Sequence, residues 1–224
     1  MSLDFDCSRV GIFKQEIKNR FRALVDFDGV ERICYIQSSS RLSNYVDLKN
    51  KPVILMPNAS NKLSFTVFAK KKKQDFMLLC PKEANDIVFS ELNRRLFSYL
   101  GYRADAIYEH FVEGYKSDIY LPKERTIIEI KAHISESSDS IFPTVYSERT
   151  LEQLAYIDKL IDRGFKIVFM ICSFNPYTRT IKLDKNSKFF SMISSLLKRG
   201  IIIKGYSVSC KNEKIIIKRE IPIL

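Results

Sequence analysis

The sequence predicts a mixed α and β fold, in which a small all-β unit precedes a larger unit of alternating strands and helices. Residues 21–80 carry short β-prone runs separated by turns, whereas beyond residue 85 apolar residues recur at helical spacing between further strand-like runs. Strands that alternate with helices imply a mixed sheet in an α/β layer. The change in period around Pro81 predicts two domains, residues 1–84 and 85–224.

Short strands account for most of the first unit. The runs 21–27 and 30–37 flank Asp28-Gly29, a dipeptide typical of two-residue hairpin turns. Three more strands are expected at residues 52–56, 63–69 and 76–80. Five strands of this length favour a small barrel or curled sheet, for which an OB-like barrel is one candidate. The lysine run 70–73 is either a phosphate contact or, as we favour, a solvated hairpin tip.

Helical periodicity begins at Asn85 in the second unit. Apolar residues at 87, 88, 92, 96 and 100 share one stripe and predict a helix that ends at Gly101. Two more helices are expected at residues 148–163 and 187–199, and a glycine follows each of them. Strands are expected at residues 117–121, 126–132, 166–172, 201–209 and 214–218, with a polar loop at 135–140.

The charge balance favours a polyanionic partner. The chain has 37 Lys and Arg against 26 Asp and Glu, a net charge of +11. Such an excess attracts phosphates without selecting one polymer, so we expect DNA or RNA as the partner. The alternative is that the basic, Ile- and Lys-rich composition reflects an AT-rich genome.

Composition also restricts where the protein works. Five scattered cysteines, odd in number and without a CxxC pair, favour a reducing compartment. No apolar run approaches the ~18 residues that a membrane span needs, and the polar start is not a signal peptide. We therefore expect a cytoplasmic protein with no membrane partner.

Several kinds of site are excluded by what the sequence lacks. With only two histidines, the chain cannot build a His-rich zinc centre, and no GxSxG elbow is present. Neither GxGxxG nor GxxxxGK[ST] occurs, so no nucleotide cofactor is expected. Any catalysis must therefore depend on carboxylates and lysines.

One segment carries a chemically informative pattern, Asp118 followed by Glu129 and Lys131. Because side chains alternate along a strand, Glu129 and Lys131 share one face. If residues 122–125 form a four-residue hairpin loop, the residues flanking the loop pair and Asp118 lies directly opposite Glu129. Two facing carboxylates destabilise a sheet, and a divalent cation between them would remove that penalty.

This arrangement suits metal-assisted phosphodiester hydrolysis. Asp118 and Glu129 would hold Mg²⁺, with Mn²⁺ as a substitute, because hard cations prefer oxygen ligands. The ion would activate a water, and Lys131 would orient that water or stabilise the transition state. The alternative is a surface ladder in which Lys131 screens two carboxylates. A second Glu-x-Lys sequence, Glu16-Ile17-Lys18, does not fit the same site because no hairpin aspartate precedes it.

The Asp-x10-Glu-x-Lys pattern on a hairpin resembles that of the PD-(D/E)xK nuclease fold. Read end to end, the sequence also resembles the sugar fermentation stimulation protein A (SfsA) family. The matches, in chain order, are Lys18-Asn19-Arg20-Phe21, Ser39-Ser40-Arg41-Leu42, Asn85, the Asp118, Glu129 and Lys131 core, Phe142-Pro143, Glu148-Arg149, Arg199-Gly200-Ile201, Gly205-Tyr206 and Ile221-Pro222. These matches span nearly the whole chain and keep the family's order.

The resemblance implies an N-terminal OB-like barrel, a C-terminal restriction-endonuclease-like α/β domain, and nucleic-acid binding or nuclease function. Carried over by position, Asp118, Glu129 and Lys131 form the catalytic core. Glu109 matches an upstream acidic position and is a candidate metal ligand or orienting residue. An exposed carboxylate at a strand edge is the alternative for Glu109.

The sequence departs from the family pattern near the core. Tyr115-Lys116 replaces Ser-Arg, which keeps one positive charge but loses the bidentate grip of Arg on phosphate. The next helix begins with Arg149-Thr150 and carries Gln153 where the family has Arg-Gly and a later His. Lys116, Arg149 and Gln153 are therefore candidate substrate-binding residues in place of the family's own.

The first unit would supply further contacts to nucleic acid. Arg20, Arg22 and Arg41 are candidates for backbone contact, and Tyr35 or Tyr45 could stack on bases. Each of these residues also fits an ordinary surface or core position. His133, beside the motif, is either a substrate contact or, as we favour, an exposed loop residue.

The leading hypothesis is a Mg²⁺-dependent nuclease acting on DNA or RNA, as a monomer or homodimer. The alternative is a nucleic-acid-binding regulatory protein of the SfsA family that does not cleave. Basic charge and a barrel serve both equally. Only the intact Asp118, Glu129 and Lys131 trio favours cleavage, since a pure binder has no use for carboxylates that repel phosphate.

Overall fold

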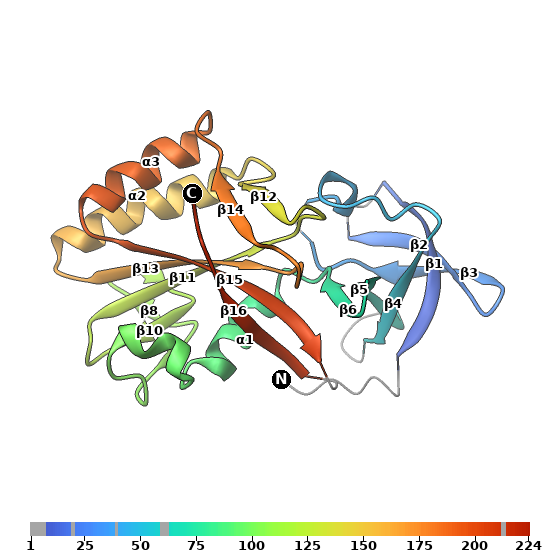
Figure 1. Ribbon diagram of the computed structural model, residues 1–224, viewed down its shortest axis with the longest axis horizontal. Helices are drawn as coiled ribbons and strands as arrows, with labels where there is room; N and C mark the ends of the chain where they lie inside the picture. The colour runs from blue at the N-terminus through green and yellow to red at the C-terminus, as the bar shows by residue number, and fades with distance from the viewer. Residues whose placement is uncertain (1–7, 19–20, 39, 59–62, 212–213) are drawn as a thin grey trace.

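The computed structural model describes residues 8–18, 21–38, 40–58, 63–211 and 214–224. It confirms a mixed α and β fold, with much more strand than helix. Two six-stranded sheets lie next to each other along the long axis of the molecule (Figure 1). The α-helices of the described residues all belong to the half of the chain that forms the second sheet. None of them is long and apolar enough to span a bilayer.

The first sheet has the strand order β3-β2-β1-β4-β5-β6. Its strands are β1 (Arg9–Glu16), β2 (Arg22–Phe27), β3 (Val30–Tyr35), β4 (Lys51–Pro57), β5 (Phe65–Lys72) and β6 (Asp75–Leu78). A parallel bridge between Tyr35 and Thr66 joins β3 to β5, so five strands form a closed ring. The predicted hairpin turn is confirmed, because Asp28 and Gly29 both have positive φ, at 55° and 73°. Strand β1 was not predicted.

The lysine run lies at the hairpin that joins β5 to β6, as expected, with Lys71 and Lys73 exposed, but the other two lysines are not solvated tip residues. Lys70 and Lys72 belong to β5, and only Lys73, with φ 56°, lies at the turn. Lys70 forms an ion pair with Glu136, and Lys72 donates to the Glu136 carbonyl. The side chain of Lys70 is only 12% exposed because it reaches across to the other half of the chain.

The second sheet has the order β16-β15-β13-β11-β10-β7, with a parallel centre of β11, β13 and β15. Its strands are β7 (Ile107–Tyr108), β10 (Ile119–Leu121), β11 (Thr126–His133), β13 (Lys166–Ser173), β15 (Ile202–Lys211) and β16 (Lys214–Ile221). Two short two-stranded sheets pair β8 (Phe111–Val112) with β9 (Tyr115–Lys116) and β12 (Asp139–Phe142) with β14 (Thr180–Leu183). Strands β7, β8, β9, β12 and β14 were not predicted.

Helices cover both faces of the second sheet (Figure 1). The helices α2 (Glu148–Asp162) and α3 (Lys188–Lys198) pack together on one face, and α1 (Glu83–Glu91) lies on the other. Alternate residues of β13 accordingly enter different cores, with Phe169 on the α2 side and Met170 on the opposite side. The core that contains Met170 also contains Val67 and Leu78 of the first sheet. The two sheets therefore share one hydrophobic core. The boundary between two domains at residue 84 stays a prediction.

The helix predictions are confirmed except for the first one. Ser147 and Ser187 cap α2 and α3 by accepting from a backbone N–H in the first turn. The helix expected from Asn85 to Gly101 is instead interrupted, with α1 followed by the 3-10 helix η3 (Arg95–Leu100). Arg94 has an extended backbone between them (φ −67°, ψ 151°), and its guanidinium donates to the Ile217 carbonyl of β16.

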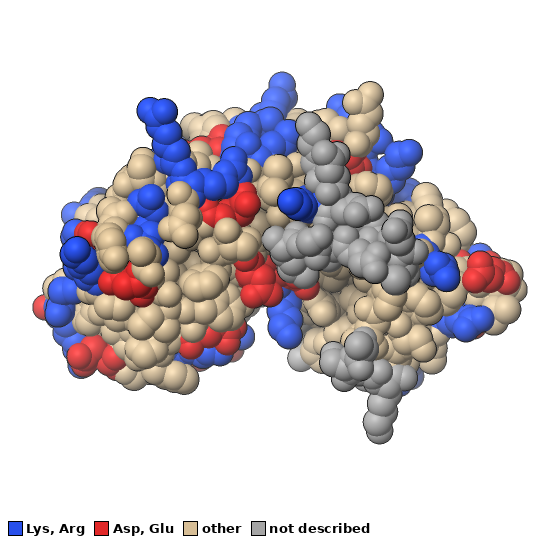
Figure 2. Space-filling view, turned by 90° about the horizontal axis from the view of Figure 1, so that it is seen from below, with Lys and Arg blue, Asp and Glu red and all other residues tan. Residues whose placement is uncertain are grey.

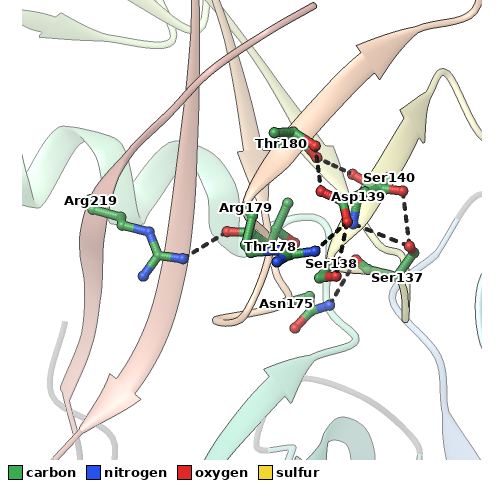
Figure 3. Close-up of polar contacts among 9 residues, drawn as sticks. All are labelled: Ser137, Ser138, Asp139, Ser140, Asn175, Thr178, Arg179, Thr180 and Arg219. Carbon is green, nitrogen blue, oxygen red and sulfur yellow. Dashed lines mark hydrogen bonds and ion pairs between the residues drawn. The ribbon is translucent and has the colours of Figure 1, made fainter.

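A buried polar cluster fixes the loop that follows β11 (Figure 3). The Asn175 amide is buried and donates to the carbonyls of Ser135, Glu136 and Ser137 at 3.0, 3.2 and 3.1 Å. Arg219 of β16 donates to the Thr178 carbonyl of the same turn at 2.9 Å. Asn175 therefore fixes the backbone of Glu136, the residue to which Lys70 and Lys72 bond.

Replacing Asn175 with alanine is expected to lower the free energy of unfolding by about 2 kcal/mol, because three loop carbonyls lose their shared donor. Chemical denaturation of both proteins measures this difference. Asn44→Ala, at an exposed asparagine in the first half of the chain, is the matched control and should change the value by less than about 0.5 kcal/mol. Equal effects of the two substitutions would contradict the role given to Asn175.

Candidate functional site

The candidate site is built on the β10–β11 hairpin. Leu121 pairs with Thr126, as predicted, and the ladder ends at Ile119 and Ile128, one pair before Asp118. Beyond the last backbone pair, the contact with β11 is made by the Asp118 side chain, whose Oδ2 accepts from the backbone N–H of Ile130 at 2.7 Å. Asp118 is thereby fixed at the edge of β11, next to Glu129.

Glu129 and Lys131 share one face of β11, as predicted, and this face is directed toward α2. Glu129 is fully buried; its Oε1 accepts from Lys131 Nζ at 2.5 Å and its Oε2 from the Tyr115 hydroxyl at 2.5 Å. Lys131 Nζ also donates to Gln153 Oε1 of α2 at 2.7 Å. A buried carboxylate, a lysine and a helix glutamine thus form one connected network.

Burial and the neighbouring Glu129 destabilise the ionised form of Asp118. Burial, and then the nearby charge of Glu129, raises the pKa of Asp118 to about 6. The Ile130 N–H, the Lys131 ammonium and the Asn85 amide, which donates to Asp118 Oδ1 at 2.8 Å, only partly offset this increase. The protein therefore holds negative charge at a site where a cation would be stabilising.

Tyr115 is held as a hydrogen-bond donor to Glu129. Burial, and then the Glu129 carboxylate, raises the pKa of Tyr115 far above its ordinary value, so the phenol keeps its proton. Arg149, exposed in the first turn of α2, opposes this increase more weakly. The Tyr115 ring stacks on Tyr156, whose hydroxyl donates to the Glu113 carbonyl at 2.6 Å.

The chemistry of this cluster fits Mg²⁺ better than a metal that needs many protein ligands. No group of three or more His, Cys, Asp or Glu side chains that could hold a metal occurs in the part of the chain that is described. Mg²⁺ is commonly bound through only one or two carboxylates, with water and substrate phosphate completing its shell. Each oxygen of Asp118 and Glu129 accepts one hydrogen bond and retains a further lone pair for a cation.

The other predicted residues lie outside this network. Glu109 is exposed, and its carboxylate forms an ion pair with Lys116 at 2.5 Å; only its backbone N–H reaches the Asp118 carbonyl. Arg22 and Arg41 are exposed in the first half of the chain. Arg20 lies outside the described residues. Among the described residues predicted to bind substrate, Gln153 hydrogen-bonds to Lys131, and the Lys116 ammonium bonds only to Glu109.

The expectation that His133 lies in an exposed loop was wrong. β11 extends to His133, which pairs with Ser173 of β13 and is 2% exposed. Burial lowers its pKa to about 4, so the imidazole is neutral at physiological pH. Its Nδ1 lies 3.4 Å from the Thr144 hydroxyl, and its Nε2 is buried without a hydrogen-bond partner among the described residues.

Two contributors to the site had no assigned role in the sequence analysis. Asn85 was noted only as a family match, and Tyr115 only as a departure from the family. Both act through hydrogen bonds to a carboxylate distant in sequence. No local pattern around either residue indicates such a partner.

Positive charge is not concentrated in a single patch on the face shown in Figure 2. Lys and Arg side chains are spread over it, with Asp and Glu groups among them. The net charge of +11 therefore favours the attraction of a polyanion in general. The distribution of charge on this face does not identify a nucleic-acid binding site.

Fold and site together define a protein of two joined sheets that carries a buried carboxylate pair beside a lysine. No family model matches the chain. It is similar to the sugar fermentation stimulation protein homolog of Sulfurisphaera tokodaii, at 22% identity over 215 residues, which are 95% of this chain and 90% of that protein. The homolog of the same name from Pyrobaculum islandicum is 23% identical over 199 residues, 86% of this chain and 84% of that protein.

A solved structure shares the fold over its whole length. The structure of Pyrococcus furiosus SfsA in complex with Ca²⁺ superposes with a TM-score of 0.85 and 16% sequence identity, covering 100% of this chain and 98% of that one. At this identity the likeness shows the fold alone. The chain is thus similar over most of its length to two sugar fermentation stimulation protein homologs, and it shares its fold with one solved SfsA structure.

Proposed function

We propose that this protein is a metal-dependent nuclease of the SfsA family that hydrolyses phosphodiester bonds of DNA or RNA. The observation that carries the proposal is the fully buried Glu129 carboxylate, hydrogen-bonded to Lys131, beside Asp118, whose pKa is raised to about 6. Perturbed carboxylates paired with a lysine are typical of catalytic sites. The basic charge of the chain supports a polyanionic substrate.

Asp118 and Glu129 would hold Mg²⁺, with Mn²⁺ as a substitute. When bound, such an ion polarises the scissile phosphate and lowers the pKa of a coordinated water. The Ca²⁺ complex of Pyrococcus furiosus SfsA supports a cation site in the fold, since Ca²⁺ and Mg²⁺ both take oxygen ligands. Asn85 and Tyr115 orient the carboxylates by donating to one oxygen of each.

Lys131 would act directly on the substrate. Its Nζ donates to Glu129 and Gln153, and the side chain as a whole is 19% exposed, so the ammonium has a third donor for a phosphate oxygen or an attacking water. An ammonium fixed in a largely desolvated site stabilises negative charge that develops in the transition state. Gln153 is then a positioning residue that sets the direction of the Lys131 ammonium.

The domain assignments belong to the same proposal. The closed ring of five strands in the first half of the chain supports an OB-like barrel. The hairpin-borne motif and the sheet with helices on both faces support a restriction-endonuclease-like second half. In this arrangement the first sheet contributes contacts to the strand that the second sheet cleaves.

The test is cleavage of end-labelled single- and double-stranded DNA and RNA in Mg²⁺, Mn²⁺ and EDTA. We expect products with either metal and none in EDTA. Glu129→Gln, which preserves volume but removes the charge, should lower the rate at least about 10²-fold. Glu152→Gln, at an exposed position on α2, is the matched control and should retain the wild-type rate. Absence of metal-dependent products on every substrate would overturn the proposal.

A second candidate function is nucleic-acid binding without cleavage. One observation favours it: both oxygens of Glu129 are already engaged, by Tyr115 and Lys131, in a closed network. In that case EDTA and Glu129→Gln would leave binding unchanged while no products form. The cleavage assay, with binding measured alongside, separates the two candidates.

A further inference from the structure

A cavity of about 480 Å³ lies directly beside the catalytic candidates. Lys131 lines it at one end, and Tyr45, His133, Phe142, Tyr146 and Thr150 line the rest together with other residues. Tyr45 comes from the first half of the chain and the others from the second, so the cavity spans the junction of the two halves. Tyr45 was a candidate for base stacking in the sequence, but no motif predicted the cavity itself.

Half of the lining residues are aromatic or aliphatic, and the other half are polar or charged. Tyr146 is 64% exposed, whereas Phe142, which also lines the cavity, is buried. Large exposed aromatics at a cavity are suited to stacking against a flat ring. The Thr150 hydroxyl and the Asn186 amide are the kinds of group that can read the edge of such a ring.

His133 supplies an unsatisfied polar atom at the inner wall. It lines the cavity, is 2% exposed, and its Nε2 lacks a hydrogen-bond partner among the described residues. A buried polar atom without a partner is costly unless something else satisfies it. Because this atom is itself inaccessible to solvent, a ligand in the cavity would reach it only after the His133 ring moves.

The rim of the cavity favours an anion. Ser147 and Ser187, the N-cap residues of α2 and α3, both line it, so the positive ends of two helices meet there. Lys131 and Lys188 add positive charge, against the single carboxylate of Asp184. The cavity therefore combines aromatic rings with cationic side chains, Lys131 among them.

We propose that this cavity receives an unpaired nucleobase of the strand to be cleaved, with the phosphate of that nucleotide at the rim beside Lys131. The assignment rests on the proposed nuclease function. The volume suits a base and part of its sugar, and stacking on an aromatic ring accepts every base. A base within a duplex cannot reach the cavity without leaving the stack, so the substrate is single-stranded or locally opened.

The test measures binding separately from cleavage. Fluorescence anisotropy of labelled 12-nucleotide DNA, single-stranded or as a duplex, is recorded with the full chain in EDTA. We expect the single strand to bind at least tenfold more tightly than the duplex. Tyr146→Ala should weaken single-strand binding about tenfold, the loss of one stacked base. Tyr102→Ala, at an exposed aromatic outside the cavity, should change it less than twofold.

A strand with abasic positions isolates the base itself. Removing all bases from the central half of the strand should weaken wild-type binding, and Tyr146→Ala should then have no further effect. Equal affinity for single strand and duplex, or the same Tyr146→Ala effect on the abasic strand, would overturn the base assignment. A lower dissociation constant for free thymidine 5′-phosphate than for the single strand would also overturn the assignment, in favour of a mononucleotide ligand.

Failure of this assignment and failure of the nuclease proposal give different results. Metal-dependent cleavage that is insensitive to Tyr146→Ala would leave the nuclease in place and overturn the cavity. Base-dependent binding without cleavage in any metal would overturn the nuclease and leave a single-strand binding cavity. Thermal unfolding of the Tyr146→Ala protein, expected to match wild type, excludes a folding defect.

Discussion

Lys131→Met is expected to lower the free energy of unfolding by about 3 kcal/mol, because the fully buried Glu129 carboxylate loses its cationic partner. Methionine preserves most of the side-chain length, so the loss of charge dominates over the loss of packing. The same change should lower the rate of phosphodiester cleavage at least about 10²-fold, since the ammonium that would stabilise the transition state is absent.

The two effects are measured by denaturant unfolding and by the end-labelled cleavage assay. Lys198→Met, at an exposed lysine at the end of α3, is the control and should change stability by less than about 0.5 kcal/mol. Millimolar Mg²⁺ should restore part of the lost stability, because a cation at Glu129 replaces the missing charge. Unchanged stability in Lys131→Met would contradict the Glu129–Lys131 pair.

The hairpin and its motif could be predicted from the sequence because the determining interactions are local. Alternation along a strand places Glu129 and Lys131 on one face, and a four-residue loop sets the pairing of Leu121 with Thr126. Ser147 could likewise be placed at a helix start, since a cap acts within one turn. In each case the sequence contains both partners within a few residues.

The remainder of the site depends on contacts between distant segments. Asn85 reaches Asp118 across 33 positions, and Gln153 reaches Lys131 across 22. The same limit explains two errors. Lys70 was expected in solvent but pairs with Glu136, 66 positions away, and His133 was expected in a loop but is buried by strands that pair later in the chain. No periodicity encodes such partners.

Asp118→Asn is expected to stabilise the metal-free protein at pH 8 by about 3 kcal/mol, even though it removes a catalytic candidate. The pKa of Asp118 is raised from an ordinary value of 3.8 to about 6, so the folded state binds more protons than the unfolded state between these values. Stability due to this group therefore falls as pH rises from about 4 to about 6 and stays low above it. Asparagine removes the buried charge yet can still accept from the Ile130 N–H.

The difference in unfolding free energy between Asp118→Asn and wild type is measured in EDTA. It should be small near pH 4 and should reach its expected maximum at pH 8. His133, whose pKa is lowered to about 4, destabilises both proteins equally in acid and cancels from the difference. Asp139→Asn is the control of opposite sign, since hydrogen bonds from Thr180 and Arg179 lower the pKa of Asp139 and its ionised form stabilises the fold. Mg²⁺ should stabilise wild type and not Asp118→Asn. If the variant is less stable than wild type at pH 8, the Asp118 carboxylate stabilises the fold without a metal. That result would contradict a site whose negative charge is stabilised only by a bound cation.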